Sequence, residues 1–198
     1  SGNHNQSLEQ ALSLVDAAAY AGADAIKLQT YTADTMTLDS NRDSFIIKDK
    51  KSLWSGEKLY NLYKKAHTPW EWHEVIFNRA KSKGIICFSS PFDDTAVDFL
   101  ESLQTPAYKI ASFENNHIPL IKKVASTKKP LIISTGMASI ADIDKAIMVA
   151  RDEGCEDIIL LKCTSTYPSS PVNSNIKTIP HMSKLFDCQI GLSDHTLG

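Results

Sequence analysis

The chain has 198 residues, 42% of them hydrophobic, and a formal net charge of −2 at pH 7. This length and composition fit one large globular domain, or part of one, with a sizeable hydrophobic core. The charge gives no general attraction to nucleic acid or to an anionic membrane surface, so neither is expected as a partner. No apolar run reaches the roughly 18 residues of a membrane span. The four widely spaced cysteines form no Cys-x-x-Cys pair and suit a reducing cytoplasm.

Helix-like and strand-like segments alternate along the chain. The strands are expected at 25–28, 85–88, 107–110, 131–134, 158–162 and 189–192. The helices are expected at 8–20, 57–66, 70–83, 93–102, 119–126 and 141–153, with partly helical structure over 174–185. A long polar stretch over 30–56 is typical of a lid or a binding segment.

Strands that alternate with helices predict an α/β fold with a parallel sheet. A doubly wound nucleotide-binding sheet usually has a glycine-rich turn after its first strand, and this chain has none there. We therefore predict a (β/α)8 TIM-type barrel, of which about six of the eight strands are present. A complete barrel takes about 250 residues, so residues 1–198 are expected to be a partial barrel without its first and last strands.

Each predicted strand is followed by polar residues, and in α/β proteins the active site lies at the carboxyl ends of the strands. Lys27 and Lys109 occupy strand ends and would suit a phosphate or carboxylate ligand. Lys162 is also in a strand, where it either points outward or belongs to the site. Three different strand ends carry small hydroxyls and exposed amides, which either cradle an anion or cap helices: Ser89, Ser90, Ser112, Ser134, Thr135 and Gly136.

Four other residues near the strand ends have side chains suited to chemistry. Glu114 could transfer a proton or grip a sugar hydroxyl, or it could be a solvated loop carboxylate. His195 could bind a divalent metal, and Asp194 could serve the site or orient a neighbour. Tyr167 could contact a ligand or pack within its loop.

The motifs GADAIKLQT, FSSPFDDTAVDFLE, PAYKIASFE, KPLIISTGM, LLKCTSTYP and GLSDHTLG occur in this order along the whole chain and resemble the sialic acid synthase family. The stretches SGNHNQS, LQTYTADTMTLDS and KIASFEN are most similar to the branch that makes pseudaminic acid. The resemblance implies a metal-dependent condensation of phosphoenolpyruvate with an open-chain amino-sugar aldehyde in cell-surface glycan biosynthesis. For this branch the sugar is 2,4-diacetamido-2,4,6-trideoxy-L-altrose, and the metal is Mn2+ or Mg2+.

The resemblance also implies roles for individual residues. The positions that match phosphoenolpyruvate contacts are Lys27, Ser90, Lys109, Ser112, Ser134 and Ser193. Glu114 matches the catalytic acid, His195 matches a metal ligand at the catalytic centre, and Tyr167 and Asp194 are assigned to the sugar side. Ser165 replaces an asparagine found in some relatives, which leaves its phosphate contact open. A domain-swapped homodimer is implied for the parent protein, with a carboxyl-terminal antifreeze-like domain that is expected to be absent from residues 1–198.

Three alternatives stay open. A relative that makes N-acetylneuraminate or legionaminic acid would share most of these residues. A Schiff-base aldolase would use Lys109 or Lys162 as its nucleophile. The chain could also be a folded piece without catalytic activity, and little turnover is expected of it in isolation.

Overall fold

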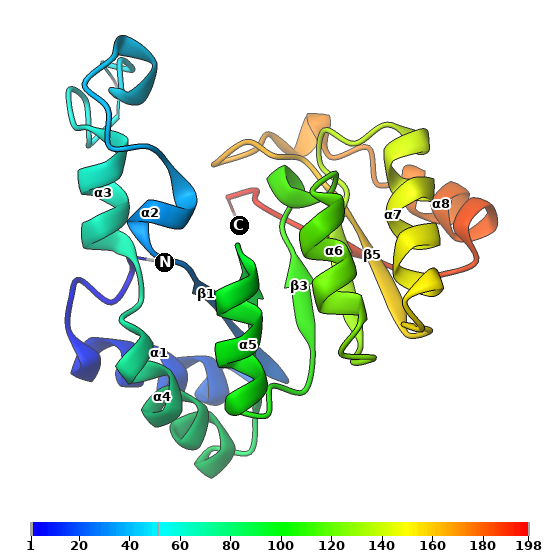
Figure 1. Cartoon of the computed structure of the whole chain (residues 1–198), viewed down its shortest axis with the longest axis horizontal. Helices are drawn as coiled ribbons and strands as arrows, with labels where there is room; N and C mark the ends of the chain where they lie inside the picture. The colour runs from blue at the N-terminus through cyan, green and yellow to red at the C-terminus, as the bar shows by residue number, and fades with distance from the viewer. Residues whose placement is uncertain (1, 51, 198) are drawn as a thin grey trace. The chain divides into compact units, whose positions relative to one another are not determined.

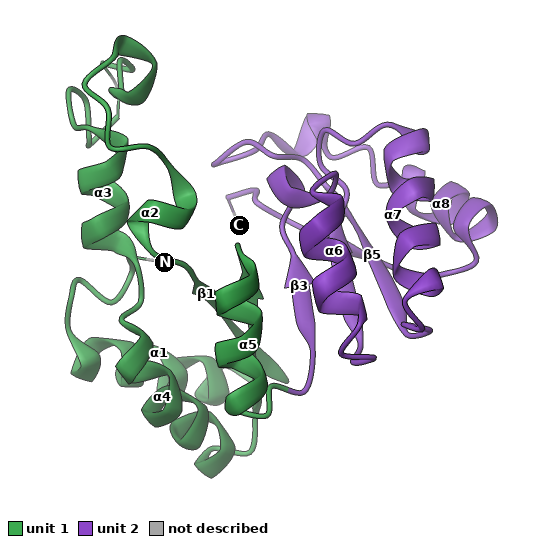
Figure 2. Cartoon of the chain, in the orientation of Figure 1, with its two compact units in different colours: residues 1–105 green, residues 106–198 purple. Residues whose placement is uncertain are grey.

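The computed structural model describes residues 2–50 and 52–197. The chain divides into two compact units, residues 1–105 and residues 106–198 (Figure 2). In the first unit the elements are α1 (Leu8–Tyr20), β1 (Ala25–Thr30), α2 (Ala33–Met36), η1 (Asp43–Phe45), α3 (Leu59–Ala66), α4 (Trp70–Ser82), β2 (Ile86–Pro91) and α5 (Asp94–Ser102) (Figure 1). In the second they are β3 (Tyr108–Ile110), η2 (Ser112–Glu114), α6 (Ile118–Ala125), β4 (Leu131–Ser134), α7 (Ile140–Asp152), β5 (Ile158–Cys163), η3 (Pro171–Asn173), α8 (Thr178–Phe186) and β6 (Gln189–Ser193).

The first unit is built around the parallel pair β1 and β2, in which Ala25 aligns with Ile86 and Thr30 with Pro91. Because side chains alternate between the two faces of a strand, the residues of the pair divide between two faces, one of which is packed against helices. On the apolar face, side chains of both strands pack against helices α1 and α4, in a cluster formed by Ala11, Val15, Ile26, Leu28, Ile76, Ala80 and Cys87. The opposite face therefore carries Lys27, Gln29 and Ser90.

A buried hydrogen-bond chain joins helix α4 to the carboxyl ends of β1 and β2. His73 Nδ1 lies 3.1 Å from the Pro69 carbonyl oxygen, which can only accept, so Nδ1 carries the proton and Nε2 accepts. Thr30 Oγ1, 2.9 Å away, must then donate to Nε2. Ser89 Oγ, 2.7 Å from Thr30 Oγ1, donates in turn to Thr30. The neutral imidazole thus fixes the direction of every hydrogen bond in the chain.

Replacement of His73 by leucine is expected to flatten the dependence of stability on pH. Burial lowers the pKa of His73 below its usual value near 6.5. Below about pH 6.5 the His73 side chain binds a proton more readily in the unfolded chain than in the folded one. The stability that neutral His73 contributes is therefore fully present above about pH 6.5 and is lost as the pH falls through the folded-state pKa. The His73→Leu variant should be less stable at pH 7 by roughly 1–3 kcal/mol and should lose less stability on acidification.

Urea unfolding between pH 5 and 7 measures this difference. His181 lies exposed on α8, so His181→Leu serves as the control and should keep the slope of the unsubstituted protein. Equal slopes for His73→Leu and the unsubstituted protein would show that His73 does not titrate on unfolding.

The second unit contains four parallel strands in the order β3, β4, β5, β6. One face is a dry core and consists of Tyr108, Ile110, Leu131, Ile133, Ile158 and Leu160, which are 0–5% exposed. Helices α6 and α7 run alongside β3 and β5 (Figure 1) and supply the buried residues Leu120, Ile121, Val124, Ile143 and Ile147. Helix α7 begins with a capping box in which the Ser139 hydroxyl accepts from the Asp142 amide and Asp142 accepts from the Ser139 amide.

The strands and helices confirm the predicted α/β alternation, with all six expected strands present. The long polar stretch over 30–56 contains helix α2, whose amino end is closed by a capping box between Thr32 and Thr35, and the short helix η1. The partly helical structure expected over 174–185 is confirmed by helix α8, which begins at Thr178 after η3 and a turn. In the described part of the chain, every helix is too short or too polar to cross a bilayer.

Candidate active site

Four of the predicted site residues lie at the ends of neighbouring strands in the second unit. The strand register places Lys109 beside Ile132, so Lys109 and Ser134 face away from the dry core on the same side of the sheet. Ser112 and Glu114 follow β3 in the short helix η2. The Ser112 hydroxyl is buried and accepts a hydrogen bond from the Gly136 amide at 3.2 Å. Two adjacent strand ends, β3 and β4, thus bring an ammonium, a carboxyl and two hydroxyls to one edge.

Lys109 and Glu114 are both largely removed from water. Burial lowers the pKa of Lys109, although the Cys163 and Glu114 side chains oppose the shift. Burial raises the pKa of Glu114, against the influence of its own backbone amide and of Lys109. Perturbed pKa values of opposite sign in one cluster are typical of sites that transfer protons or bind charged ligands.

Several polar atoms of this cluster are buried with unused hydrogen-bonding capacity. Ser134 is 1% exposed. Neither its hydroxyl nor Glu114 Oε2 has a hydrogen-bond partner within residues 2–50 and 52–197. Buried polar atoms are normally paired. The unsatisfied atoms therefore mark places where a polar ligand would be stabilised.

His195 lies just after β6, with its ring held in one orientation. His195 Nδ1 is 3.1 Å from the carbonyl oxygen of Thr164, so Nδ1 donates and Nε2 keeps its lone pair. A backbone carbonyl on one nitrogen is the usual support for an imidazole that binds a metal through the other nitrogen. The Tyr167 ring packs against His195 at 4.3 Å between centroids. His195 therefore fits a role as one ligand of a divalent metal.

The rest of a metal shell is not assembled in the part of the chain that the structure describes, where no group of three or more histidine, cysteine or acidic side chains could hold an ion. The four cysteines are all free thiols. Asp194, predicted to contact the sugar, uses its two carboxylate oxygens to accept from the backbone amide and the hydroxyl of Thr196 at 3.1 and 2.8 Å. These bonds lower the pKa of Asp194 and give it a clear role in shaping the turn that carries His195.

The remaining predicted residues have distinct surroundings. In the first unit, Lys27 is exposed, whereas Ser90 is fully buried and its hydroxyl has no hydrogen-bond partner in the part of the chain that the structure describes. Ser193 aligns with Cys163, on the same side of its sheet as Ser134. Lys162 lies on the opposite side, that of the dry core, and donates to Thr164 Oγ1 at 2.8 Å. The sequence left open whether Lys162 points outward or belongs to the site. In the structure Lys162 is not on the face that carries Lys109.

Two residues that the sequence did not single out also belong to these faces. Gln29 lies beside Lys27 and Ser90 in the first unit, and its spacing of two from Lys27 is the signal that would have identified it. Asn115 is buried and donates through Nδ2 to the Gly136 carbonyl at 3.1 Å. Nothing in the sequence marks Asn115, because the contact joins two loops that only the fold brings together.

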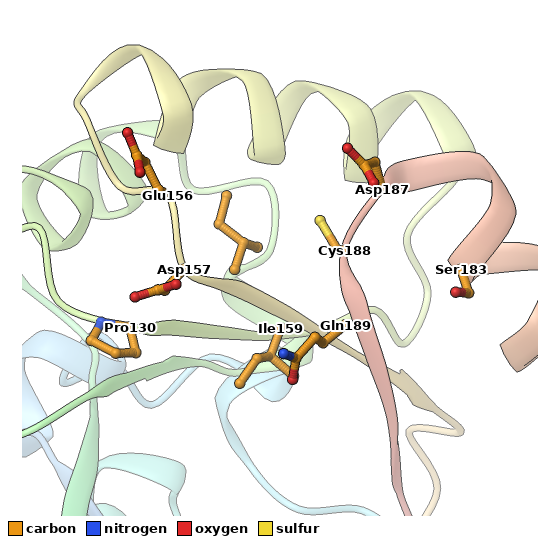
Figure 3. Close-up of a pocket in the computed structure, with 9 residues that line it drawn as sticks. Pro130, Glu156, Asp157, Ile159, Ser183, Asp187, Cys188 and Gln189 are labelled. Atoms are coloured by element: carbon orange, nitrogen blue, oxygen red, sulfur yellow. The ribbon is translucent and has the colours of Figure 1, made fainter.

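A separate cavity of about 610 Å³ lies at the amino ends of β4, β5 and β6 (Figure 3). Its lining includes Pro130, Glu156, Asp157, Cys188 and Gln189. In parallel α/β folds the amino-terminal face contributes to stability and the carboxyl-terminal face carries the chemistry. None of the predicted site residues lines this cavity, so we exclude it from the candidate site.

Comparison with known proteins identifies the family to which the chain belongs. The model of the NeuB family matches residues 14–198. Pseudaminic acid synthase from Campylobacter jejuni is 48% identical over 198 residues, all of this chain and 57% of that protein. The Helicobacter pylori pseudaminic acid synthase is 46% identical over the whole chain and 58% of its own length. N,N'-diacetyllegionaminic acid synthase from Legionella pneumophila is 36% identical over 99% of this chain and 56% of its own length. The chain therefore spans a little over half the length of these relatives.

The crystal structure of N-acetylneuraminic acid synthetase from Leptospira borgpetersenii matches 99% of this chain and 63% of that chain, with a TM-score of 0.86 and 29% sequence identity. Solved structures of this kind are TIM-barrel-type proteins, which confirms the predicted fold class. The family match covers all but the first thirteen residues. The chain belongs to the NeuB family, whose members include synthases of sialic acid-like sugars.

Proposed function

We propose that the protein carrying this chain is a pseudaminic acid synthase. It would condense phosphoenolpyruvate with 2,4-diacetamido-2,4,6-trideoxy-L-altrose, releasing phosphate. The observation that carries this proposal is the cluster of Lys109, Glu114 and Ser134 at one edge of the sheet. Its ammonium and carboxyl are largely withdrawn from water, and its serine hydroxyl has no hydrogen-bond partner among the described residues. A cytoplasmic location and a domain-swapped homodimer belong to the same proposal.

The choice of sugar is supported by sequence identity. The chain is 46–48% identical to two pseudaminic acid synthases and 36% identical to a legionaminic acid synthase. The three relatives match over nearly the same length of this chain. The difference therefore reflects residue identity rather than coverage, and we rank the legionaminic and N-acetylneuraminic acid branches second.

The proposed reaction forms one carbon–carbon bond and, at one carbon, replaces the bond to the phosphate oxygen by a bond to the oxygen of water. The methylene carbon of phosphoenolpyruvate attacks the sugar aldehyde, and the aldehyde oxygen takes up a proton to become a hydroxyl. Water adds to the resulting oxocarbenium carbon and loses a proton. The bond from that carbon to the phosphate oxygen then breaks, leaving a ketone and inorganic phosphate.

The residues of the cluster suit these steps. Lys109 would pair with the negative charge of phosphoenolpyruvate, and the Ser112 and Ser134 hydroxyls would donate hydrogen bonds to it. The raised pKa of Glu114 would let its carboxyl carry a proton nearer to neutral pH and pass it at the reacting carbon. Tyr167, whose ring packs on His195, would contact the sugar. His195 Nε2 would hold a divalent metal, which supplies Lewis-acid polarisation of the aldehyde.

A Schiff-base aldolase is the second candidate, favoured by one observation. The lowered pKa of Lys109 increases the neutral amine fraction that attacks a carbonyl. Borohydride would trap a covalent adduct on Lys109 if this candidate holds. A reaction insensitive to chelators would also favour it.

Release of inorganic phosphate from phosphoenolpyruvate tests the leading proposal. We expect release that requires both the amino sugar and Mn2+ or Mg2+ and stops when a chelator is added. Replacing the altrose derivative by N-acetylmannosamine should lower the rate. Phosphate release without sugar, or a faster reaction with N-acetylmannosamine, would contradict the proposed substrate.

A further inference from the structure

Gly136, in the loop after β4, is packed so closely that a side chain would not fit without displacing its neighbours. The place where a Cβ would stand is already taken by the Ser165 hydroxyl oxygen. The Ser112 hydroxyl oxygen lies 2.8 Å from the same point. Two hydroxyls from separate loops therefore approach each other over the bare α-carbon of Gly136.

The peptide groups around Gly136 are fixed from both sides. Asn115 Nδ2 donates to the Gly136 carbonyl at 3.1 Å, while the Gly136 amide donates to Ser112 Oγ at 3.2 Å. Asn115 is 7% exposed and Ser112 is 6% exposed, so water does not compete readily for these bonds. Asn115 thus sets the orientation of the glycine that supports the two hydroxyls.

This arrangement determines which way the Ser112 hydroxyl can donate. One lone pair of Ser112 Oγ already accepts the Gly136 amide, which leaves its hydrogen for another acceptor. Two residues before Gly136, the buried Ser134 hydroxyl has no partner among residues 2–50 and 52–197. Hydroxyl donors gathered over a glycine backbone suit a compact anion such as a phosphate or carboxylate group.

We propose that Asn115 is a positioning residue, which holds Gly136 so that the hydroxyls of Ser112 and Ser165 converge on one anionic group. The identification of that group with phosphoenolpyruvate rests on the proposed function. Two other parts of the proposal are independent of the proposed function. They are the pairing of Asn115 with the Gly136 carbonyl and the convergence of the two hydroxyls. Under this proposal Ser165, which replaces an asparagine of some relatives, is part of the anion site.

Substitution of Asn115 by aspartate tests the positioning role in the protein that carries this chain. The carboxylate keeps the shape of the amide but has no hydrogen to donate, so it faces the Gly136 carbonyl as a second acceptor. We expect the KM for phosphoenolpyruvate to rise about tenfold, the effect of one lost hydrogen bond and a repulsive contact. The KM for the sugar should stay unchanged. In a sample labelled with 15N-glycine, the amide signal of Gly136 should shift.

Asn116 provides a matched control, since it is the next residue, has the same side chain and is exposed. Asn116→Asp adds the same charge without touching Gly136 and should leave both the KM and the glycine signal as they are. A change of the same size in both variants would overturn the proposal. So would an unshifted Gly136 signal in Asn115→Asp.

Gly136→Ala is a second variant, which tests the proposal independently if Asn115→Asp fails to fold. The φ angle of Gly136 is not in the left-handed region, and the nearest obstructing atoms are serine hydroxyl oxygens that can rotate away. The alanine variant should therefore fold, with a thermal midpoint close to that of the unsubstituted protein. It should still bind phosphoenolpyruvate at least tenfold more weakly. Unchanged binding by a folded Gly136→Ala would overturn the convergence of the two hydroxyls.

Inorganic phosphate separates this proposal from the proposed function. If the protein turns over no phosphoenolpyruvate with any amino sugar, the proposed function fails. Phosphate should nevertheless shift the Gly136 amide signal in the unsubstituted protein and do so at higher concentration in Asn115→Asp. If neither phosphoenolpyruvate nor phosphate moves that signal, the anion site is wrong whatever the enzyme's reaction.

Discussion

Replacement of Lys109 by alanine is expected to lower kcat/KM for phosphoenolpyruvate by roughly 10²–10³-fold, the usual cost of removing one well-placed electrostatic donor from an active site. The physical reason is burial: an ammonium largely withdrawn from water interacts with an anion far more strongly than an exposed one. The same change leaves Glu114 buried without its nearby cation, which should raise the Glu114 pKa further. Because the proposed reaction needs the protonated Glu114 carboxyl, the fall in rate as the pH rises through the Glu114 pKa should move to higher pH in Lys109→Ala.

Steady-state kinetics from pH 5 to 9 measures both effects. Lys122 is an exposed lysine in the last turn of α6, and Lys122→Ala removes one positive charge without approaching the site. This control should keep the kinetics and the pH profile of the unsubstituted protein. If Lys109→Ala and Lys122→Ala behave alike, Lys109 does not bind the substrate.

Replacement of His195 by alanine is expected to weaken Mn2+ binding at least tenfold, since the loss of even a supporting contact to a metal ligand costs 10–100-fold. The hydrogen bond from Nδ1 to the Thr164 carbonyl already orients the imidazole in the folded protein, so metal binding loses little side-chain entropy there. Alanine removes this pre-oriented ligand. Calorimetric titration with Mn2+ measures the loss directly. Phosphate release should fall in parallel and recover in part at high metal concentration.

His181→Ala is the appropriate comparison, because His181 is an exposed histidine on α8. It should bind Mn2+ like the unsubstituted protein. A His195→Ala protein with undiminished Mn2+ affinity would remove His195 from the metal site. Full activity in the presence of a chelator would remove the metal from the reaction.

The sequence predicts which candidate residues share one edge of the sheet because of a general property of parallel sheets. Short apolar runs mark the strands, and the polar residues after them must gather at one edge. Lys109 and Ser134 were identified in this way, and the structure places them on one face of one sheet. The six strands were found for the same reason, with bounds that agree with the structure to within three residues.

The faces of the strands could not be predicted, since a strand buried on both sides reads as a continuous apolar run without alternation. Lys162 illustrates the difficulty. Its sequence setting resembles that of Lys109, yet the register places it on the side of the dry core. The hydrogen bond between Asn115 and Gly136 was also beyond prediction, because it spans 21 residues and depends on how two loops pack.

The packing around Gly136 makes folding and ligand binding separable in a genetic experiment. The atoms closest to a Cβ at this position are the hydroxyl oxygens of Ser165 and Ser112, followed by the Ser112 Cβ at 3.2 Å. All three are side-chain atoms rather than backbone, so a screen that reports protein abundance in cells should score alanine as near neutral. A screen that reports formation of the proposed product would score the same substitution as damaging. A disagreement between the two screens at a buried glycine would locate the anion site without any structure of a complex.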